Sequence, residues 1–251
     1  MKKEDLDRIR AEVQGDFFYY ESVGSTNAEA LKYANAEDKS LFLTQNQTAG
    51  RGRMGRSWEN SCGGVYMTVL LKPEGISENI SSLTLASGLA AARVIPNSTI
   101  KWPNDIILGD KKVAGILAET RVSGKNAVIA VGIGINVNNP EFSGDLAEKA
   151  TSMYLYSGET QDITEIVIRF YTEFLKIYED FKKSGFSKIK KEYEEKCVTL
   201  NREIVVLIGG KERIMTVKGI NEKGELIAIA DGKTEIINFG EVSVRGLLGY
   251  A

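Results

Sequence analysis

Histidine is absent from this sequence of 251 residues, and its absence excludes several kinds of chemistry. Without an imidazole there is no Ser-His-Asp or Cys-His nucleophilic catalysis, no histidine metal ligand and no imidazole general base. Any reaction at this protein must therefore depend on arginine, lysine, carboxylates, amides and backbone groups.

Cysteine and long apolar runs are also scarce. The two cysteines, Cys62 and Cys197, have neither metal-binding nor redox spacing, so we expect no disulfide framework and a reducing compartment. No apolar run reaches the roughly 18 to 20 residues that span a bilayer. The charged N-terminus, residues 1–5, does not resemble a signal-peptide core. The sequence therefore predicts a cytoplasmic protein with no membrane partner.

Neither sign of charge is in large excess. Lys and Arg number 32 against 34 Asp and Glu, which gives a formal net charge of −2. This balance argues against a general nucleic-acid coat protein. The 43% apolar content is ordinary for a soluble globular chain, and the length suits one large domain followed by a small one.

Apolar periodicity predicts alternating helices and strands over most of the chain. A capping-box pattern, Thr26 with Glu29, places Ser25–Asn27 where the first strand turns into a helix. Helices are expected at 5–14, from 26, at 78–95, 163–181 and 186–197, and strands at 17–20, 41–45, 65–71, 99–102, 106–108, 112–120 and 127–137.

The texture changes to short β-rich runs from about residue 199. These runs, separated by Gly-containing turns, are 204–208, 214–220, 226–230 and 235–239. Such runs indicate a small antiparallel barrel. We therefore predict an α+β protein with a mixed-sheet domain over 1–198 and a β-rich domain over 199–251.

Three glycines and three arginines alternate in the loop of residues 50–56, soon after an apolar strand. Glycine lets backbone N–H groups approach a ligand, and guanidinium groups match the geometry of carboxylates and phosphates. The loop therefore predicts anion binding, with a flexible basic surface loop as the simpler alternative.

Ser25, Thr26 and Asn27 supply two hydroxyls and an amide at one corner of the fold, and Gln47 adds a second amide. Such groups satisfy a neutral polar head such as a urea or an amide. Ser25–Asn27 taken alone is equally typical of a helix N-cap. Trp58 either covers a bound planar group or anchors the loop to the core.

Residues 101–105, Lys-Trp-Pro-Asn-Asp, combine a cation, an aromatic ring, an amide and a carboxylate. Asn104 or Asp105 is a candidate oxygen ligand for Mg²⁺. Lys112 begins a strand beside the small residues Ala114 and Gly115, which leave room for a ligand; a solvated hairpin lysine is the alternative.

Residues 132–136, Gly-Ile-Gly-Ile-Asn, lack the third glycine and the following helix of a dinucleotide fingerprint, so we reject a Rossmann site. No P-loop motif is present either. Asn136, at the end of this strand, is still a candidate to reach a phosphate or a metal.

These segments, together with Gly240–Arg245, resemble the bacterial biotin protein ligases, in the family's order across nearly the whole chain. The resemblance implies a class II synthetase-like catalytic domain and an SH3-like C-terminal barrel. It also implies a reaction of biotin with ATP that gives biotinoyl-5′-AMP, followed by transfer to one lysine of a biotin carboxyl carrier protein, typically of acetyl-CoA carboxylase.

The resemblance also assigns residues. Arg53 and Lys112 are expected to be catalytic, and Asp105 to contact Mg²⁺ through the substrate phosphates. The implied biotin-binding set is Ser25, Thr26, Asn27, Gln47, Arg51, Gly52, Arg53, Lys112 and Gly115. The implied ATP and adenylate set is Arg51, Arg53, Arg56, Trp58, Lys101, Trp102, Asn104, Asn136 and Arg245.

Repressor-type ligases carry a winged-helix domain before the catalytic domain, whereas 24 residues precede Ser25 here. We therefore expect a monofunctional ligase that does not bind operator DNA, and a homodimer is possible. A lipoate or octanoyl ligase is the nearest alternative, but its Arg-Arg-x-Ser-Gly-Gly-Gly signature is absent. A non-catalytic biotin sensor could dispense with Arg53 or Lys112, and both are present.

Overall fold

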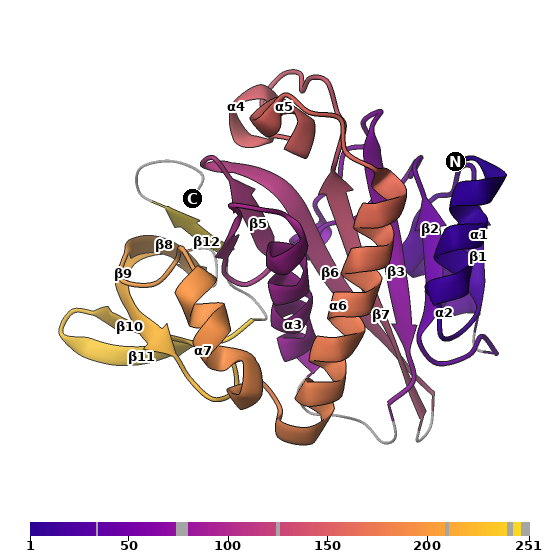
Figure 1. Ribbon diagram of the computed structural model, residues 1–251. Coiled ribbons are helices and arrows are strands. Elements are labelled where there is room, and N and C mark those ends of the chain that lie inside the picture. The colour runs from indigo at the N-terminus through magenta and orange to yellow at the C-terminus, as the bar shows by residue number, and fades with distance from the viewer. Residues whose placement is uncertain (34, 74–79, 124–125, 209–210, 240–242, 247–251) are drawn as a thin grey trace.

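A seven-stranded sheet forms the larger part of the molecule in the computed structural model, which describes residues 1–33, 35–73, 80–123, 126–208, 211–239 and 243–246 (Figure 1). Only β1 and β2 pair in parallel; the other neighbours in the sheet are antiparallel. The strands follow the order β1 (Phe17–Tyr20), β2 (Ser40–Thr44), β3 (Gly64–Leu71), β7 (Asn126–Asn136), β6 (Lys111–Ser123), β5 (Asp105–Leu108) and β4 (Thr99–Lys101).

Near β2 and β3 both faces of this sheet are apolar. Successive side chains of a strand point to opposite faces, and here each face belongs to a different hydrophobic cluster. Leu41 and Leu43 join the main core, whereas Phe42 and Leu70 join a smaller cluster with Ala30. The main core lies under α1 (Lys3–Glu12), α3 (Ile80–Val94), α6 (Ile163–Ser184) and α7 (Ser187–Lys196), and α2 (Thr26–Lys32) covers the smaller cluster on the opposite face.

The longest described helix, α6 (Ile163–Ser184), begins at the predicted residue and continues three residues beyond the predicted end at 181. Asp162 caps its N-terminus by accepting hydrogen bonds from the backbone N–H groups of Thr164 (2.8 Å) and Glu165 (3.2 Å). Gly185 ends it with a positive φ of 63°. Its apolar stripe, including Phe170, packs against α3, so this helix prediction is confirmed.

Ser25–Asn27 lies at the expected strand-to-helix turn, but the capping prediction is wrong in one respect. Ser25, not Thr26, is the N-cap, because its Oγ accepts from the Ala28 backbone N–H at 3.4 Å. Thr26 turns its side chain toward Gln47 instead. Two short helices were also missed, α4 (Leu146–Lys149) and α5 (Met153–Ser157), since so few residues show no helical period.

The β-rich C-terminal part forms a five-stranded antiparallel sheet with the order β11, β10, β9, β8, β12. Four predicted runs correspond to β8 (Glu203–Ile208), β9 (Lys211–Ile220), β10 (Leu226–Ala230) and β11 (Lys233–Ile237). The fifth strand, β12 (Ser243–Gly246), was not predicted. None of the described helices is both long and apolar enough to cross a bilayer.

Trp102 joins the two sheets. Its indole is 1% exposed, its Nε1 donates to the Gly224 carbonyl at 2.9 Å, and its ring centre lies 5.3 Å from that of Phe239. Its backbone N–H donates to Thr199 Oγ1 at 2.9 Å. The segment after β4 is therefore held against the C-terminal sheet.

Trp102→Phe is expected to lower the free energy of unfolding by about 1–3 kcal/mol, because it leaves the buried Gly224 carbonyl without its donor while it keeps an aromatic ring in place. Urea denaturation of the variant and the parent measures this difference. An unchanged midpoint with an unchanged slope would contradict it.

Candidate active site

A cavity of about 500 Å³ opens on the α2 face of the seven-stranded sheet, over β6 and β7. It brings together nearly all the residues that the sequence singles out, from segments up to about a hundred positions apart. Those that line it are Ser25, Thr26, Asn27, Gln47, Arg51, Gly52, Arg53, Arg56, Trp58, Lys101, Trp102, Asn104, Asp105, Lys112, Gly115 and Asn136. Of the predicted residues only Arg245 is missing from this set; its backbone lies in β12, and its side chain and residues 240–242 lie outside the described part of the structure.

The floor of the cavity is made of glycines in neighbouring strands. Gly115 of β6 lies opposite Gly134 of β7, and Trp58 lies across both. A Cβ atom would stand 2.8 Å from the Trp58 ring at Gly134 and 2.5 Å from it at Gly115. At Gly132 a Cβ would overlap Asn27 Oδ1. The absence of side chains at these three positions therefore makes room for the indole and the amide.

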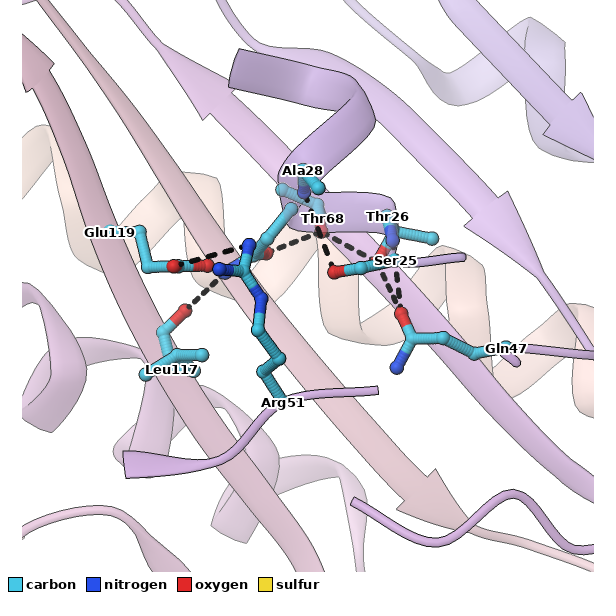
Figure 2. A network of polar contacts seen from close by, with 9 residues as sticks. Ser25, Thr26, Ala28, Gln47, Arg51, Thr68, Leu117 and Glu119 are labelled. Atoms are coloured by element: carbon cyan, nitrogen blue, oxygen red, sulfur yellow. Dashed lines mark hydrogen bonds and ion pairs between the residues drawn. The ribbon is translucent and has the colours of Figure 1, made fainter. Parts of the chain in front are cut away.

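A buried polar network closes one end of the cavity (Figure 2). Gln47 Oε1 accepts from the Thr26 backbone N–H at 2.9 Å and from its hydroxyl at 3.3 Å. Thr68 Oγ1 lies 2.8 Å from Thr26 Oγ1 and donates to Asn27 Oδ1 at 2.7 Å. The hydroxyl and amide groups of this end carry no formal charge, as predicted for a neutral polar head, and the charged Arg51 beside them is paired with Glu119.

Glu119 supports the same network from β6. Its Oε2 accepts from Asn27 Nδ2 at 2.8 Å, and its Oε1 lies 3.4 Å from Arg51 Nη2. Sequence reasoning missed Glu119 and Thr68, and also the floor role of Gly132 and Gly134. One signal was available for Thr68, which is a polar residue inside the otherwise apolar run of β3.

Cationic side chains gather toward the other end. Lys112 Nζ lies 2.5 Å from Asp105 Oδ1 and 5.1 Å from the centre of the Trp58 ring. A register shift in the β5–β6 pairing, between Ile106 and Ile107, brings Lys112 to this face, the same face as Gly115.

Arg53 connects the glycine/arginine loop to two other parts of the chain. Its Nη1 donates to Asn104 Oδ1 at 3.1 Å, and its Nη2 donates to the Phe239 carbonyl at 2.5 Å. Burial lowers the pKa of its guanidinium from the ordinary value, but an arginine remains charged at neutral pH. The charged Arg53 side chain therefore holds the loop of residues 50–56 over the cavity through these two hydrogen bonds.

The predicted contact of Asp105 with Mg²⁺ through the substrate phosphates remains a prediction. Asp105 is paired with the Lys112 ammonium, and Asn104 Oδ1 accepts from Arg53. No cluster of three or more carboxylate or thiol side chains suited to a metal ion occurs in the described ranges. These residues do not fit a resident metal ion.

Two residues that the resemblance assigns to nucleotide binding donate side-chain hydrogen bonds to backbone carbonyls of the protein. Asn136 is 5% exposed, and its Nδ2 donates to the Thr151 carbonyl at 3.1 Å. Trp102 uses its indole N–H on Gly224. Their predicted nucleotide contacts, and that of the buried Lys101, remain predictions.

Taken together, the cavity has a neutral polar end, a flat glycine and aromatic middle, and a cationic end. This arrangement suits a small polar ring whose chain ends in a carboxylate, next to phosphate groups. The cations can oppose charge that develops on phosphoryl oxygens, and no nucleophilic side chain is needed.

Comparison with known proteins agrees with this geometry. The biotin/lipoate A/B protein ligase family model matches residues 19–136, and the biotin protein ligase C-terminal domain model matches residues 199–245. The biotin–[acetyl-CoA-carboxylase] ligase of Paracoccus denitrificans is 32% identical over 234 residues, which cover 88% of this chain and 98% of the relative. The chain belongs to the biotin protein ligase family.

The biotin protein ligase of Aquifex aeolicus, solved in complex with biotin and ATP, superposes with a TM-score of 0.82 at 31% identity, over 92% of this chain and 99% of that one. The predicted fold class, a mixed-sheet α+β part followed by a small antiparallel sheet, is thereby confirmed. The bifunctional ligase/repressor BirA of Bacillus spizizenii is 34% identical over 194 residues, and the match spans 72% of this chain but only 60% of that protein.

Proposed function

We propose that this protein is an ATP-dependent ligase that activates biotin as biotinoyl-5′-AMP and transfers the biotinoyl group to one lysine of a biotin carboxyl carrier protein of the acetyl-CoA carboxylase type. The observation that carries the proposal is that one cavity has both a neutral amide and hydroxyl end and a cationic end. Biotin has matching chemistry, a cyclic urea at one end and a carboxylate at the other. Membership of the family supports the same assignment.

In the first step a biotin carboxylate oxygen attacks the α-phosphorus of ATP, a C–O–P bond forms, and pyrophosphate leaves. Two anions meet in this step and charge grows on the phosphoryl oxygens, so fixed cations are the required catalysts. We assign this role to Lys112 and Arg53. The nucleophile is already ionised, so the lack of histidine is no obstacle. Mg²⁺ enters in this proposal with ATP, as part of the substrate.

In the second step the neutral amine of the carrier lysine attacks the acyl carbon of the adenylate. An amide bond forms and the nitrogen loses one proton to solvent, while the bond between the acyl carbon and the phosphate oxygen breaks and AMP leaves. The loop of residues 50–56 lies over the cavity through Arg53 and excludes water from the anhydride.

Transfer of labelled biotin to a carrier domain tests the proposal. We expect one labelled lysine in the carrier, and none when that lysine is replaced by arginine. Labelling of a lipoyl domain with lipoate, and none of the biotin carrier, would move the protein to the lipoate ligase side of the family. Binding of biotin without any transfer would favour the sensor alternative.

Gly132→Ala is expected to weaken biotin binding by about 10- to 100-fold, because the added methyl group displaces the hydrogen-bonded Asn27 amide. Titration calorimetry with biotin measures the effect. Gly219→Ala in β9 is the matched control, since nothing lies within 4 Å of a Cβ there. Equal affinities of the two variants would contradict this use of the glycine floor.

The remaining assignments are proposals as well. We place the protein in the cytoplasm and expect the 251-residue chain not to bind operator DNA, with a homodimer as a possible assembly. We also propose 1–198 and 199–251 as its domains. Specific binding to a biotin-operon operator at physiological salt would contradict the proposal that the chain does not bind operator DNA.

A further inference from the structure

Glu119 lies directly behind the polar end of the cavity. It follows Gly115 and Leu117 on the same face of β6 and pairs in register with Ala130 of β7. Its side chain is 25% exposed, and it is not among the residues that line the cavity. In Figure 2 its carboxylate points toward both the start of α2 and the loop arginine, Arg51. Glu119 can therefore act on a ligand only through other residues.

The amide of Asn27 has one orientation that satisfies its surroundings. Its two N–H groups donate to Glu119 Oε2 at 2.8 Å and to the Leu117 carbonyl at 3.0 Å, both of which only accept. Its Oδ1 accepts from Thr68 and lies over Gly132, which lines the cavity. The reverse orientation would set Oδ1 against a carboxylate and a carbonyl. The remaining hydrogen-bonding capacity of this buried amide is therefore that of an acceptor.

Gln47 is fixed with the opposite polarity. Its Oε1 accepts both the backbone N–H and the hydroxyl of Thr26, so its NH2 group remains to donate. A cyclic urea carries N–H donors beside a carbonyl acceptor. One acceptor from Asn27 and one donor from Gln47 match these two groups.

We propose that Glu119 is a positioning residue that holds the Asn27 carbonyl as the acceptor for a ureido N–H group and so contributes to the choice of substrate ring. This inference rests on the proposed function. It depends on the contact between Glu119 and the 4% exposed Asn27, not on the 3.4 Å ion pair with the half-exposed Arg51, since exposed pairs contribute little.

The test is titration calorimetry with biotin, and with biotin methylated on a ureido nitrogen, in the absence of ATP. Glu119→Met removes the acceptor and is expected to weaken biotin binding about tenfold while reducing the discrimination against the methylated ligand. Glu119→Gln keeps an oxygen that accepts from Asn27, and we expect it to bind biotin within about threefold of the parent. Glu165→Met is the control, because Glu165 is also a glutamate paired with an arginine, Arg8, but it lies in α6, on the opposite face of the sheet from α2.

A double-mutant cycle separates positioning from a general loss of structure. In an Asn27→Ala background, Glu119→Met is expected to have no further effect on biotin affinity. An additive effect there, or parent-like affinity of the Glu119→Met chain, would overturn the inference. If the Glu119→Met variant does not fold, Glu119→Asp replaces it, because the shorter side chain withdraws the carboxylate from Asn27 but keeps its charge. We expect Glu119→Asp to weaken biotin binding as stated for Glu119→Met. A parent chain that binds lipoate and not biotin would instead overturn the proposed function.

Discussion

Lys112→Ala is expected to slow the formation of biotinoyl-5′-AMP by about 100- to 1000-fold, corresponding to about 2.7–4 kcal/mol of transition-state stabilisation, by analogy with the loss of one oxyanion-hole donor. The ammonium stands at the cationic end of the cavity, 2.5 Å from Asp105 and over the face of Trp58. Its removal leaves the phosphoryl charge with one fewer fixed cation. Single-turnover formation of the adenylate with saturating biotin and ATP measures the effect.

The neighbouring lysine provides a matched control. Lys111 is partly exposed, its Nζ donates to the Ala147 carbonyl at 2.8 Å, and it does not line the cavity. We expect Lys111→Ala to form the adenylate within a few-fold of the parent rate. If Lys112→Ala also stayed within a few-fold, the role assigned to Lys112 would be wrong.

Arg53→Gly is expected to weaken retention of the adenylate by about 10- to 100-fold, through the loss of hydrogen bonds made by a charged group. In the structure this guanidinium ties the loop to Asn104 and to the Phe239 carbonyl. Without it the loop no longer holds the anhydride away from solvent. The expected result is free biotinoyl-5′-AMP in solution and labelling of bystander lysines, measured by chromatography and by mass spectrometry of an added bystander protein.

Arg121→Ala serves as the control for that experiment. Arg121 Nη1 also donates to a backbone carbonyl, that of Leu31, at 3.0 Å, but outside the cavity. We expect it to retain the adenylate as the parent does. Tight retention by Arg53→Gly, with no labelling of bystanders, would contradict the proposed function of the loop.

The main helices and strands, and the types of residue in the cavity, can be predicted from the sequence because both depend on local patterns. The apolar stripe of α6 marks a long helix, and the turn at Ser25 brings hydroxyl and amide groups to one corner. The glycines and arginines of residues 50–56 indicate an anion-binding loop without any knowledge of its partners. These features predict which residues meet, and the cavity contains them.

The remaining features depend on register and on contacts between distant segments. Glu119 reaches Asn27 only because β6 passes beside the start of α2, across 92 positions of sequence. The glycine floor requires Gly115 to lie opposite Gly134, which the sequence does not specify. The pairing of Lys112 with Asp105 follows from a register shift in the β5–β6 ladder, which the sequence does not specify either.

Biotin-dependent exchange of labelled pyrophosphate into ATP, with Mg²⁺ present and with lipoate and octanoate tested in parallel, addresses the central proposal most directly. Exchange isolates the adenylation step and needs no carrier protein. We predict rapid exchange with biotin and none with lipoate or octanoate. Exchange with lipoate but not with biotin, or no exchange with any of the three acids, would contradict the assignment of a biotin-adenylating ligase.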